Sequence, residues 1–378
     1  MSDMCELAAQ LQSHNWSGRT WMWDIRDAIG PMSIAQVAMV GTHNTATSRI
    51  TRTSKFGRDG PKMLRKNGVL ASFVRFVGGV FLPSWSKCQR MTIEGQLNFG
   101  VRYFDLRIAP YSELSTSLYT THGLLSTKLE EVLGAVETFV TDPATSHEFI
   151  LLDFQHVFLS PNDPGYTAFF QSLLRIKEIC VPRPANGAPF PSLSELWKTR
   201  QRVFIFMGCN FDVDQLAFVC SREQHLSSPW LNKHNKRDLL HALDEQALAQ
   251  RRTYAEKVFS TQAIITPNYR TVLSGFFTFG ILPSSVRALA KSANPDLMQW
   301  FWMRNTSCTP SIGMHKNVLL LDFPELSMAE VRWDGGSLRG TAVDICVCAN
   351  LLRGLKSASA PERVLSCRLR PSDDMAGD

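Results

Sequence analysis

Residues 100–108 of the chain are Gly-Val-Arg-Tyr-Phe-Asp-Leu-Arg-Ile, and this stretch does most to decide the fold. Side chains alternate between the two faces of a β-strand, so Val101, Tyr103, Asp105 and Arg107 share one face of the strand that we predict here. An inward-facing Asp and Arg form either a buried ion pair or part of a functional site. Their neighbours along the chain decide between these interpretations.

Further strand-like runs follow one another along the chain, with helical or loop material between them. About eight strands with intervening helices are typical of a (β/α)8 barrel or a doubly wound sheet, and continuous apolar strands favour a parallel one. We predict an α/β fold, a single and somewhat irregular (β/α)8 barrel of the TIM-like type. The predicted strands are residues 34–40, 101–108, 117–121, 149–154, 203–207, 263–266 and 318–321, with a weaker one at 300–303, and the predicted helices are 124–140, 168–176 and 237–258.

Polar residues stand at the ends of several of these strands. His43, Arg107, His122 and Asp322 end the first, second, third and last strands if the order is simple. Active residues of such barrels lie at the C-terminal ends of strands, and the last strand closes against the first, so the four form a contiguous arc. This set suits acid–base chemistry on a phosphate ester. One imidazole removes a proton, the other supplies one, and the guanidinium holds the phosphoryl charge.

Size and composition limit the classes of protein to consider. A chain of 378 residues holds either two average domains or one large barrel, and 44% hydrophobic residues are enough for a real core. The net charge of +6 fits an anionic partner, such as a phosphoinositide-bearing membrane or a nucleic acid, without choosing between them. We predict a lead-in segment at residues 1–30, the barrel at 31–357 and a C-terminal tail at 358–378.

Cysteine usage and apolar runs bear on the compartment. The nine cysteines are scattered without a CxxC pair, which indicates a reducing, cytoplasmic environment. The N-terminus carries acidic residues and no long apolar run, so we expect no secretory signal. No apolar stretch reaches the roughly 20 residues that cross a bilayer. The expected localisation is therefore cytoplasmic, with peripheral association with membranes.

A long insertion at residues 45–93 interrupts the alternation of strands and helices. It holds ten Lys and Arg residues and a single acid, Asp59. Lys62 and Arg65 are candidate contacts for anionic lipid, although a charge run is usually a solvated face. Its apolar part and the uncharged run at residues 271–286 either pack on the barrel as helices or insert into a lipid interface.

Three motifs occur in an order that is specific to one family. The segment with Gly41-Thr-His43-Asn44, Gly100 to Arg107 and Thr121-His122-Gly123 resembles the catalytic X region of phosphatidylinositol-specific phospholipases C. The resemblance extends more loosely from about residue 34 to residue 324, and it is greatest to the eukaryotic X-domain-only proteins. It implies a phosphoric diester hydrolase that cleaves phosphatidylinositol-type lipids through a cyclic inositol phosphate.

The resemblance also implies catalytic roles for individual residues. His43 would be the general base that takes the proton of the inositol 2-hydroxyl group. His122 would be the general acid that protonates the diacylglycerol oxygen as it leaves. Arg107 would hold the non-bridging oxygens as negative charge grows. Asp322 would hydrogen-bond His43 and fix its tautomer, and Asp105 would brace Arg107 or His122.

Calcium-dependent members of the family carry acidic ligands at two alternating positions of the second strand and one more on the fourth. Here Arg107 stands at the second of these positions. On the fourth strand the acidic position falls on Phe154, with Asp153 as the alternative inward group. Calcium needs several hard oxygen ligands, and a guanidinium opposes it. We therefore predict a site without metal, and no other cofactor.

The residues that would recognise the headgroup follow the family pattern only in part. Asn44 is a candidate contact for the phosphate or the nucleophilic hydroxyl group. Bacterial members use an Asp and a Tyr two residues later on the sixth strand to read inositol, and here Pro267 replaces the Asp while Tyr269 remains as a stacking candidate. The expected partner is membrane phospholipid at a peripheral surface, with no nucleic acid, and the oligomeric state stays open. The alternatives are a catalytically weak phosphoinositide-binding scaffold and a phosphodiesterase for another phospholipid headgroup.

Overall fold

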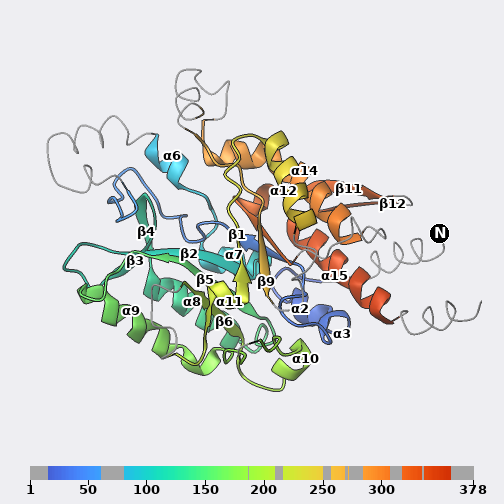
Figure 1. The fold of residues 1–378 in the computed structure, drawn as a ribbon, viewed down its shortest axis with the longest axis horizontal. Coiled ribbons are helices and arrows are strands. Elements are labelled where there is room, and N and C mark those ends of the chain that lie inside the picture. The colour runs from blue at the N-terminus through green and yellow to red at the C-terminus, as the bar shows by residue number, and fades with distance from the viewer. Residues whose placement is uncertain are drawn as a thin grey trace, which may run out of the picture.

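The computed structural model describes residues 16–60, 81–185, 187–208, 216–249, 257–268, 271, 284–306, 317–333 and 336–358. These residues form a nearly closed barrel of eight parallel strands with helices around it, which can be followed in Figure 1. The prediction of a single (β/α)8 barrel is confirmed. Parallel strands in such a barrel are covered on both faces, which explains why runs such as β6 are apolar and buried along their whole length.

The barrel strands run around the barrel in the order β7-β6-β5-β2-β1-β10-β9-β8, and neighbours pair in parallel. Among the described residues no pairing joins β7 to β8, so the barrel is open there. The predicted closure of the last strand against the first is confirmed, because β10 pairs with β1. The eight strands are β1 (Met39–Thr42), β2 (Tyr103–Pro110), β5 (Ile150–Val157), β6 (Val203–Met207), β7 (Val219–Ser221), β8 (Leu226–Ser227), β9 (Val258–Gln262) and β10 (Val318–Leu321).

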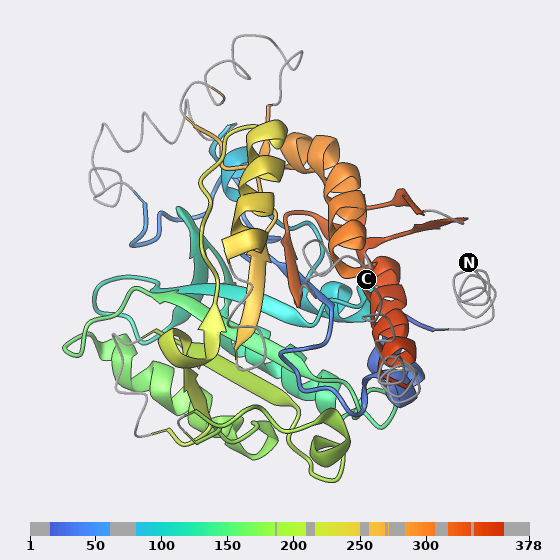
Figure 2. The ribbon, with the colours of Figure 1, turned by 45° about the vertical axis from the view of Figure 1, so that its right-hand side comes forward.

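Helices cover the barrel, and a small hairpin stands outside it. The hairpin of β11 (Ala329–Trp333) and β12 (Gly336–Gly340) packs beside α14 and α15 and projects from the molecule in Figure 2. None of the helices in the described ranges combines the length and apolar character needed to span a bilayer. The helices are α2 (Trp21–Asp24), α3 (Arg26–Ile29), α6 (Leu82–Ser86), α7 (Ile93–Phe99), α8 (Leu129–Thr141), α9 (Pro164–Arg175), α10 (Leu193–Leu196), α11 (Arg222–His225), α12 (Lys236–Ala249), α14 (Val286–Thr306) and α15 (Ala342–Ala358), with 3-10 turns η1 (Lys177–Ile179) and η3 (Pro324–Leu326).

The third predicted strand is not a barrel strand. It corresponds to β3 (Leu118–His122), which pairs antiparallel with β2 and with β4 (Leu124–Lys128). The prediction that His122 ends the third parallel strand is therefore wrong, and the strand predicted at residues 149–154 is the third in the barrel. The predicted helix at residues 124–140 is also wrong in its first turn. Leu124 and Leu125 are buried as hairpin residues, and the helix begins only at Leu129.

Two other predicted strands differ from the structure. One real strand lies earlier in the chain than predicted, and the other predicted strand is part of a helix. The run at residues 263–266 lies after β9, whose polar members Ser260, Thr261 and Gln262 are all buried and hide the strand from a hydrophobicity pattern. The weak strand at residues 300–303 is part of α14, in which Trp300, Phe301 and Trp302 are all buried. Trp302 packs against Trp333 of the outer hairpin. β1 is shorter than its prediction and begins only at Met39.

A fully buried ion pair ties the N-terminal segment to the end of the barrel where the strands begin. Arg102 precedes β2, and its Nη2 donates to Glu148 Oε2 over 2.7 Å. The same guanidinium donates to the carbonyl oxygens of Gly18 and Arg19. Glu148 in turn accepts a hydrogen bond from the backbone N–H of Trp23. The described part of the predicted lead-in, residues 16–30, thus packs on the barrel through α2 and α3.

Candidate active site

His43 and Asp322 lie side by side because their strands do. His43 follows β1 directly and Asp322 follows β10, and the two strands pair in parallel with Thr42 opposite Leu321. The His43 Nδ1 and Asp322 Oδ1 atoms are 2.9 Å apart, and both side chains are largely buried. A carboxylate only accepts hydrogen bonds, so Nδ1 carries the proton and the Nε2 lone pair of His43 is left for another partner.

Asn44 connects His43 to β2. Its side-chain amide donates to His43 Nε2 over 3.0 Å, and its backbone N–H donates to Asp105 Oδ2 over 3.1 Å. Asn44 has a positive φ of 45°, a conformation that asparagine tolerates better than most residues. Asp105 was expected to brace Arg107 or His122. It instead accepts a hydrogen bond from the backbone just after His43, and within the described residues no hydrogen bond or ion pair joins it to either side chain.

His122 lies opposite His43 at the tip of the β3–β4 hairpin. Its Nδ1 is 2.9 Å from the carbonyl oxygen of Ser86, the last residue of α6, so Nδ1 carries a proton and donates it there. The two imidazole rings have their centroids 6.0 Å apart at an angle of 69°. Burial, followed by the positive charge of Arg107 and by His43, lowers the pKa of His122 to about 4.

Arg107 owes its position to an irregularity between β2 and β5. The register shifts between Leu106 and Arg107, so that Leu106 pairs with Phe154 but Arg107 pairs with His156. The extra residue, Gln155, accepts a hydrogen bond from Arg107 Nε over 3.1 Å. Bulges of this kind re-aim side chains near functional sites. No hydrogen bond or ion pair within the described ranges involves the Nη atoms of Arg107, and its positive charge acts on His122.

The inward group of β5 is Asp153, and Phe154 faces outward. Phe154 packs against Phe169 of α9, with ring centroids 5.4 Å apart. Asp153 Oδ2 accepts a 2.5 Å hydrogen bond from the Tyr103 hydroxyl group, and Oδ1 lies 2.7 Å from Nε of Arg222. The expectation that Phe154 occupies the acidic position is therefore wrong. Burial raises the pKa of Asp153 to about 6, against the opposing charge of Arg222.

Cys88 and Gln89 belong to the site although the sequence suggested no role for them. The buried Cys88 Sγ lies 3.5 Å from His122 Nδ1 and 3.6 Å from Asn44 Nδ2. Gln89 Nε2 donates to the carbonyl oxygens of His43 and Leu321, so it joins the ends of β1 and β10. Only the fold places these two residues beside the two histidines.

The donor atoms near His43 do not suit calcium. His43, Cys88 and Asp322 have potential ligand atoms within 4.8 Å of one another, but they offer only one carboxylate. Burial keeps the pKa of the Cys88 thiol well above its usual range, so the sulfur stays protonated. Calcium takes six to eight oxygen ligands, and the carboxylate of Asp153 is already paired with Arg222.

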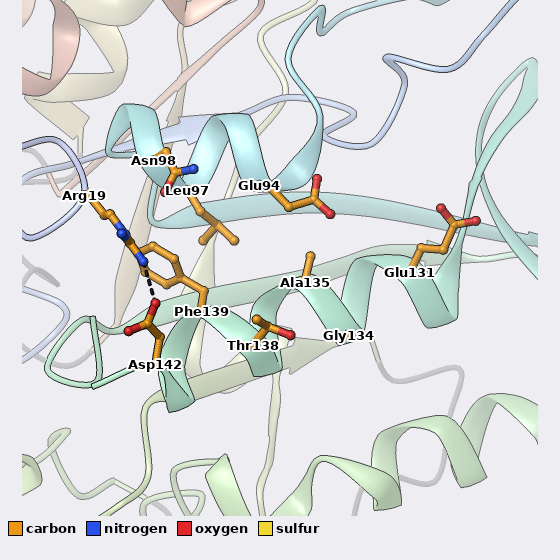
Figure 3. Close-up of a pocket in the computed structure, with 10 residues that line it drawn as sticks. All are labelled: Arg19, Glu94, Leu97, Asn98, Glu131, Gly134, Ala135, Thr138, Phe139 and Asp142. Carbon is orange, nitrogen blue, oxygen red and sulfur yellow. Dashed lines mark hydrogen bonds and ion pairs between the residues drawn. The ribbon is translucent and has the colours of Figure 1, made fainter. Parts of the chain in front are cut away.

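A pocket elsewhere on the barrel contains none of the predicted site residues. It lies between α7 and α8, has a volume of about 460 Å³, and is shown in Figure 3. Two of its four charged residues, Arg19 and Asp142, form an ion pair with each other over 2.5 Å. The predicted lipid contacts Lys62 and Arg65 and the stacking candidate Tyr269 lie outside the described residues.

Comparison with known proteins gives close relatives over nearly the whole chain. A Variant-surface-glycoprotein phospholipase C from Trypanosoma cruzi is 35% identical over 368 residues, which cover 92% of this chain and 96% of that protein. The protein of the same name from Trypanosoma brucei brucei is 32% identical and covers 89% and 96%. The human PI-PLC X domain-containing protein 3 is 28% identical and covers 81% and 89%. No family model matches the chain.

Solved structures share the fold at low sequence identity. The phosphatidylinositol-specific phospholipase C from Listeria monocytogenes has a TM-score of 0.54 at 14% identity and covers 88% of this chain and 99% of its own. The Staphylococcus aureus enzyme has a TM-score of 0.55 at 13% identity, with 88% and 98% covered. These likenesses establish the barrel architecture, independently of the sequence relatives.

Proposed function

Since the chain belongs to the phosphatidylinositol-specific phospholipase C family, we propose that its two facing histidines cleave phosphatidylinositol-type phospholipids by general base and general acid catalysis. The observation that carries this proposal is the complementary fixing of the two rings. Asp322 holds Nδ1 of His43, and the carbonyl oxygen of Ser86 holds Nδ1 of His122. Each imidazole therefore has only Nε2 left with which to exchange a proton with substrate.

In the first step His43 Nε2 takes the proton of the inositol 2-hydroxyl group, and the oxygen attacks phosphorus. The Asn44 amide now bonded to Nε2 has to release it, and Asn44 Oδ1, which is buried and unpaired among the described residues, can then accept a hydrogen bond from substrate. Asp322 stabilises the imidazolium that forms. The new oxygen–phosphorus bond closes a cyclic inositol phosphodiester.

The bond from phosphorus to the diacylglycerol oxygen breaks as His122 Nε2 gives that oxygen a proton. His122 must be protonated at both nitrogens beforehand, which its low pKa disfavours in the free protein. A bound phosphodiester anion offsets the repulsion from Arg107 and raises this pKa. Arg107 meanwhile holds the non-bridging oxygens. Water can then open the cyclic ester with the roles of the two histidines reversed.

The reaction needs no metal in this proposal. Arg107 supplies the positive charge that calcium supplies in other members of the family. The inward carboxylate of β5 is paired with Arg222 and is not free to act as a ligand. Asp105 accepts a backbone hydrogen bond from Asn44 and positions the residue next to His43. In this site Asp153 pairs with Arg222 and Asp105 binds the backbone of Asn44.

A second candidate substrate follows from the names of the relatives. The proteins at 35% and 32% identity are phospholipases C named for a surface glycoprotein. A phosphatidylinositol-type lipid whose headgroup carries a glycoprotein therefore deserves a direct comparison with free phosphatidylinositol. The replacement of the inositol-reading Asp by Pro267 fits a headgroup that is modified on the sugar ring.

The test is phosphorus NMR of the purified chain with vesicles of phosphatidylinositol, or of a glycosylated phosphatidylinositol, in the presence of EDTA. We expect a cyclic inositol phosphate signal that is lost in His43→Ala and His122→Ala. Asp142→Asn, which alters an exposed ion pair outside the site, is the matched control and should keep the wild-type rate. Loss of the signal in EDTA would overturn metal independence. Binding without turnover of any headgroup would favour the scaffold alternative.

A further inference from the structure

A short segment that precedes the β3–β4 hairpin in the chain pairs with this hairpin as a partial third strand. Residues 55–60, which we call the clip, are Lys-Phe-Gly-Arg-Asp-Gly. Phe56 forms an antiparallel bridge with Leu124, and the carbonyl oxygen of Lys55 accepts a hydrogen bond from the Leu125 N–H over 2.7 Å. The Gly57 N–H donates to the carbonyl oxygen of Gly123 over 3.0 Å. The clip therefore follows the start of β4 and the turn that carries His122.

Asp59 holds both residues that flank His122. Its Oδ1 accepts a 2.6 Å hydrogen bond from the Thr121 hydroxyl group, and its Oδ2 accepts a 2.6 Å hydrogen bond from the Gly123 N–H. Gly123 has a positive φ of 72° and is the one residue between β3 and β4. Hydrogen bonds to a carboxylate are stronger than those between neutral groups. The turn at His122 is thus fixed from both sides by one side chain.

The clip approaches the hairpin so closely that two of its positions need glycine. A Cβ atom on Gly57 would lie 2.0 Å from Thr121 Oγ1 and 2.5 Å from Asp59 Oδ1. One on Gly60 would lie 2.9 Å from the carbonyl oxygen of Gly123. These distances are shorter than any real contact, so side chains here would push Asp59 away from the hairpin. The absence of side chains at Gly57 and Gly60 therefore allows the Asp59 carboxylate to reach the hairpin.

The neighbour of Asp59 anchors the clip independently. Arg58 forms a two-pronged ion pair with Asp163, the N-cap residue of α9, over 2.5 and 2.8 Å. It also donates to the carbonyl oxygen of Phe158. A bidentate pair fixes direction as well as distance. Arg58 therefore holds the clip to the barrel, while Asp59 is left to bind the hairpin.

We propose that Asp59 is a positioning residue for the general acid His122. It contacts neither the imidazole nor the substrate, and acts by fixing the backbone on both sides of His122. This inference rests on the role of His122 in the proposed function. The ring itself is held at Nδ1 by Ser86, so backbone and ring together aim Nε2 at the leaving oxygen. The negative charge of Asp59 also favours protonated His122, as a general acid requires.

The experiment compares two leaving groups in Asp59→Asn. A soluble inositol phosphodiester with an alkyl leaving group needs the acid, whereas one with a nitrophenyl leaving group departs without a proton. We expect kcat to fall about tenfold or more with the alkyl ester and to change less than about twofold with the nitrophenyl ester, as for partial loss of general acid catalysis. Thr121→Val should show the same pattern more weakly, and Thr121→Ser, which keeps the hydroxyl group, should retain the wild-type ratio.

Asp142→Asn is the matched control, because it neutralises an ion-paired aspartate outside the clip. NMR of the His122 ring supplies a readout that does not depend on turnover, and its signal should shift in Asp59→Asn and stay in place in the control. An equal loss with both esters, or an unmoved His122 signal, would overturn the positioning role. If His122→Ala itself shows no dependence on the leaving group, the acid role in the proposed function fails, and the NMR result still decides whether Asp59 positions the ring.

Discussion

At the scale of single residues, the Asp322 carboxylate fixes the tautomer of the His43 imidazole, and its negative charge favours the protonated ring. It accepts a hydrogen bond from Nδ1 over 2.9 Å, so Nε2 is the basic nitrogen. In the proposed reaction the carboxylate also faces the imidazolium that forms on His43. In Asp322→Asn the carboxamide can donate to Nδ1 and select the wrong tautomer. We predict a fall in kcat of about a hundredfold, within the usual contribution of a general base, with little change in KM.

Steady-state kinetics on phosphatidylinositol vesicles checks this prediction. The comparison with Asp322→Ala is informative, because alanine removes the charge without offering a competing donor. A rise in KM with unchanged kcat in Asp322→Asn would contradict the assignment, since it would indicate a role in binding substrate rather than in proton transfer.

The pKa of His122 reports the charge that surrounds it. Burial lowers this pKa most, and the positive charge of Arg107 lowers it next, to about 4. Removing a neighbouring cation favours the protonated imidazole, so Arg107→Met should raise the pKa of His122 toward its usual value near 6.5. Inorganic phosphate should raise the pKa of His122 in the wild-type protein, because a bound anion also favours the protonated imidazole.

Histidine-selective NMR titration measures these shifts. Arg26→Met serves as the control, because Arg26 lies in α3, where it donates to the carbonyl oxygen of Trp23 outside the site. An unchanged or lower His122 pKa in Arg107→Met would show that Arg107 lies too far from the ring to share a phosphate with it.

At the scale of elements, the barrel pattern was predictable and the hairpin was not. β6 and β10 match their predicted bounds because each is a continuous buried apolar run. The hairpin of β3 and β4 arises from non-local pairing with β2, which overrides the helical spacing that begins at Leu124. His122 therefore ends a strand, as predicted, but that strand is antiparallel to its barrel neighbour β2.

The ion pair of Arg102 and Glu148 belongs to this scale, because it joins α2 and the start of β2 to the turn before β5. Both side chains are fully buried. Removing one partner leaves an uncompensated charge, so Arg102→Met and Glu148→Gln should each destabilise the fold by about 3–5 kcal/mol. The double variant Arg102→Met/Glu148→Met should lose less than the sum of the two single losses.

Urea unfolding measures these changes in stability. The pair lies where the barrel strands begin, whereas His43 lies where β1 ends. The folded fraction of each variant should therefore have the kcat of the wild-type protein. A single variant within about 1 kcal/mol of the wild-type protein would show that water reaches the pair when one partner is lost.

At the scale of the whole molecule, the sequence predicts the barrel architecture more accurately than it predicts the contacts within the site. The neighbouring positions of His43, Arg107 and Asp322 follow from strand order, because β10, β1 and β2 are adjacent in the barrel, although β2 continues for three residues beyond Arg107. The bulge that turns Gln155 toward Arg107 and the pairing of Asp153 with Arg222 do not follow. Both depend on register and on side chains from distant elements, and a one-residue shift in register exchanges Asp153 for Phe154.

The net charge of +6 gives a prediction about the membrane surface as a partner. Attraction between this charge and anionic lipid acts over a Debye length of about 10 Å at 0.1 M salt, and it shortens as salt is added. Binding to vesicles that contain phosphatidylinositol should therefore weaken about tenfold or more between roughly 0.05 M and 0.5 M salt. Binding to vesicles of neutral phosphatidylcholine alone should be weaker throughout and nearly independent of salt. Sedimentation with sucrose-loaded vesicles measures both, with His43→Ala/His122→Ala used to prevent turnover. Equal affinity for the two vesicle types at low salt would contradict electrostatic recruitment and leave apolar contacts as the main attraction.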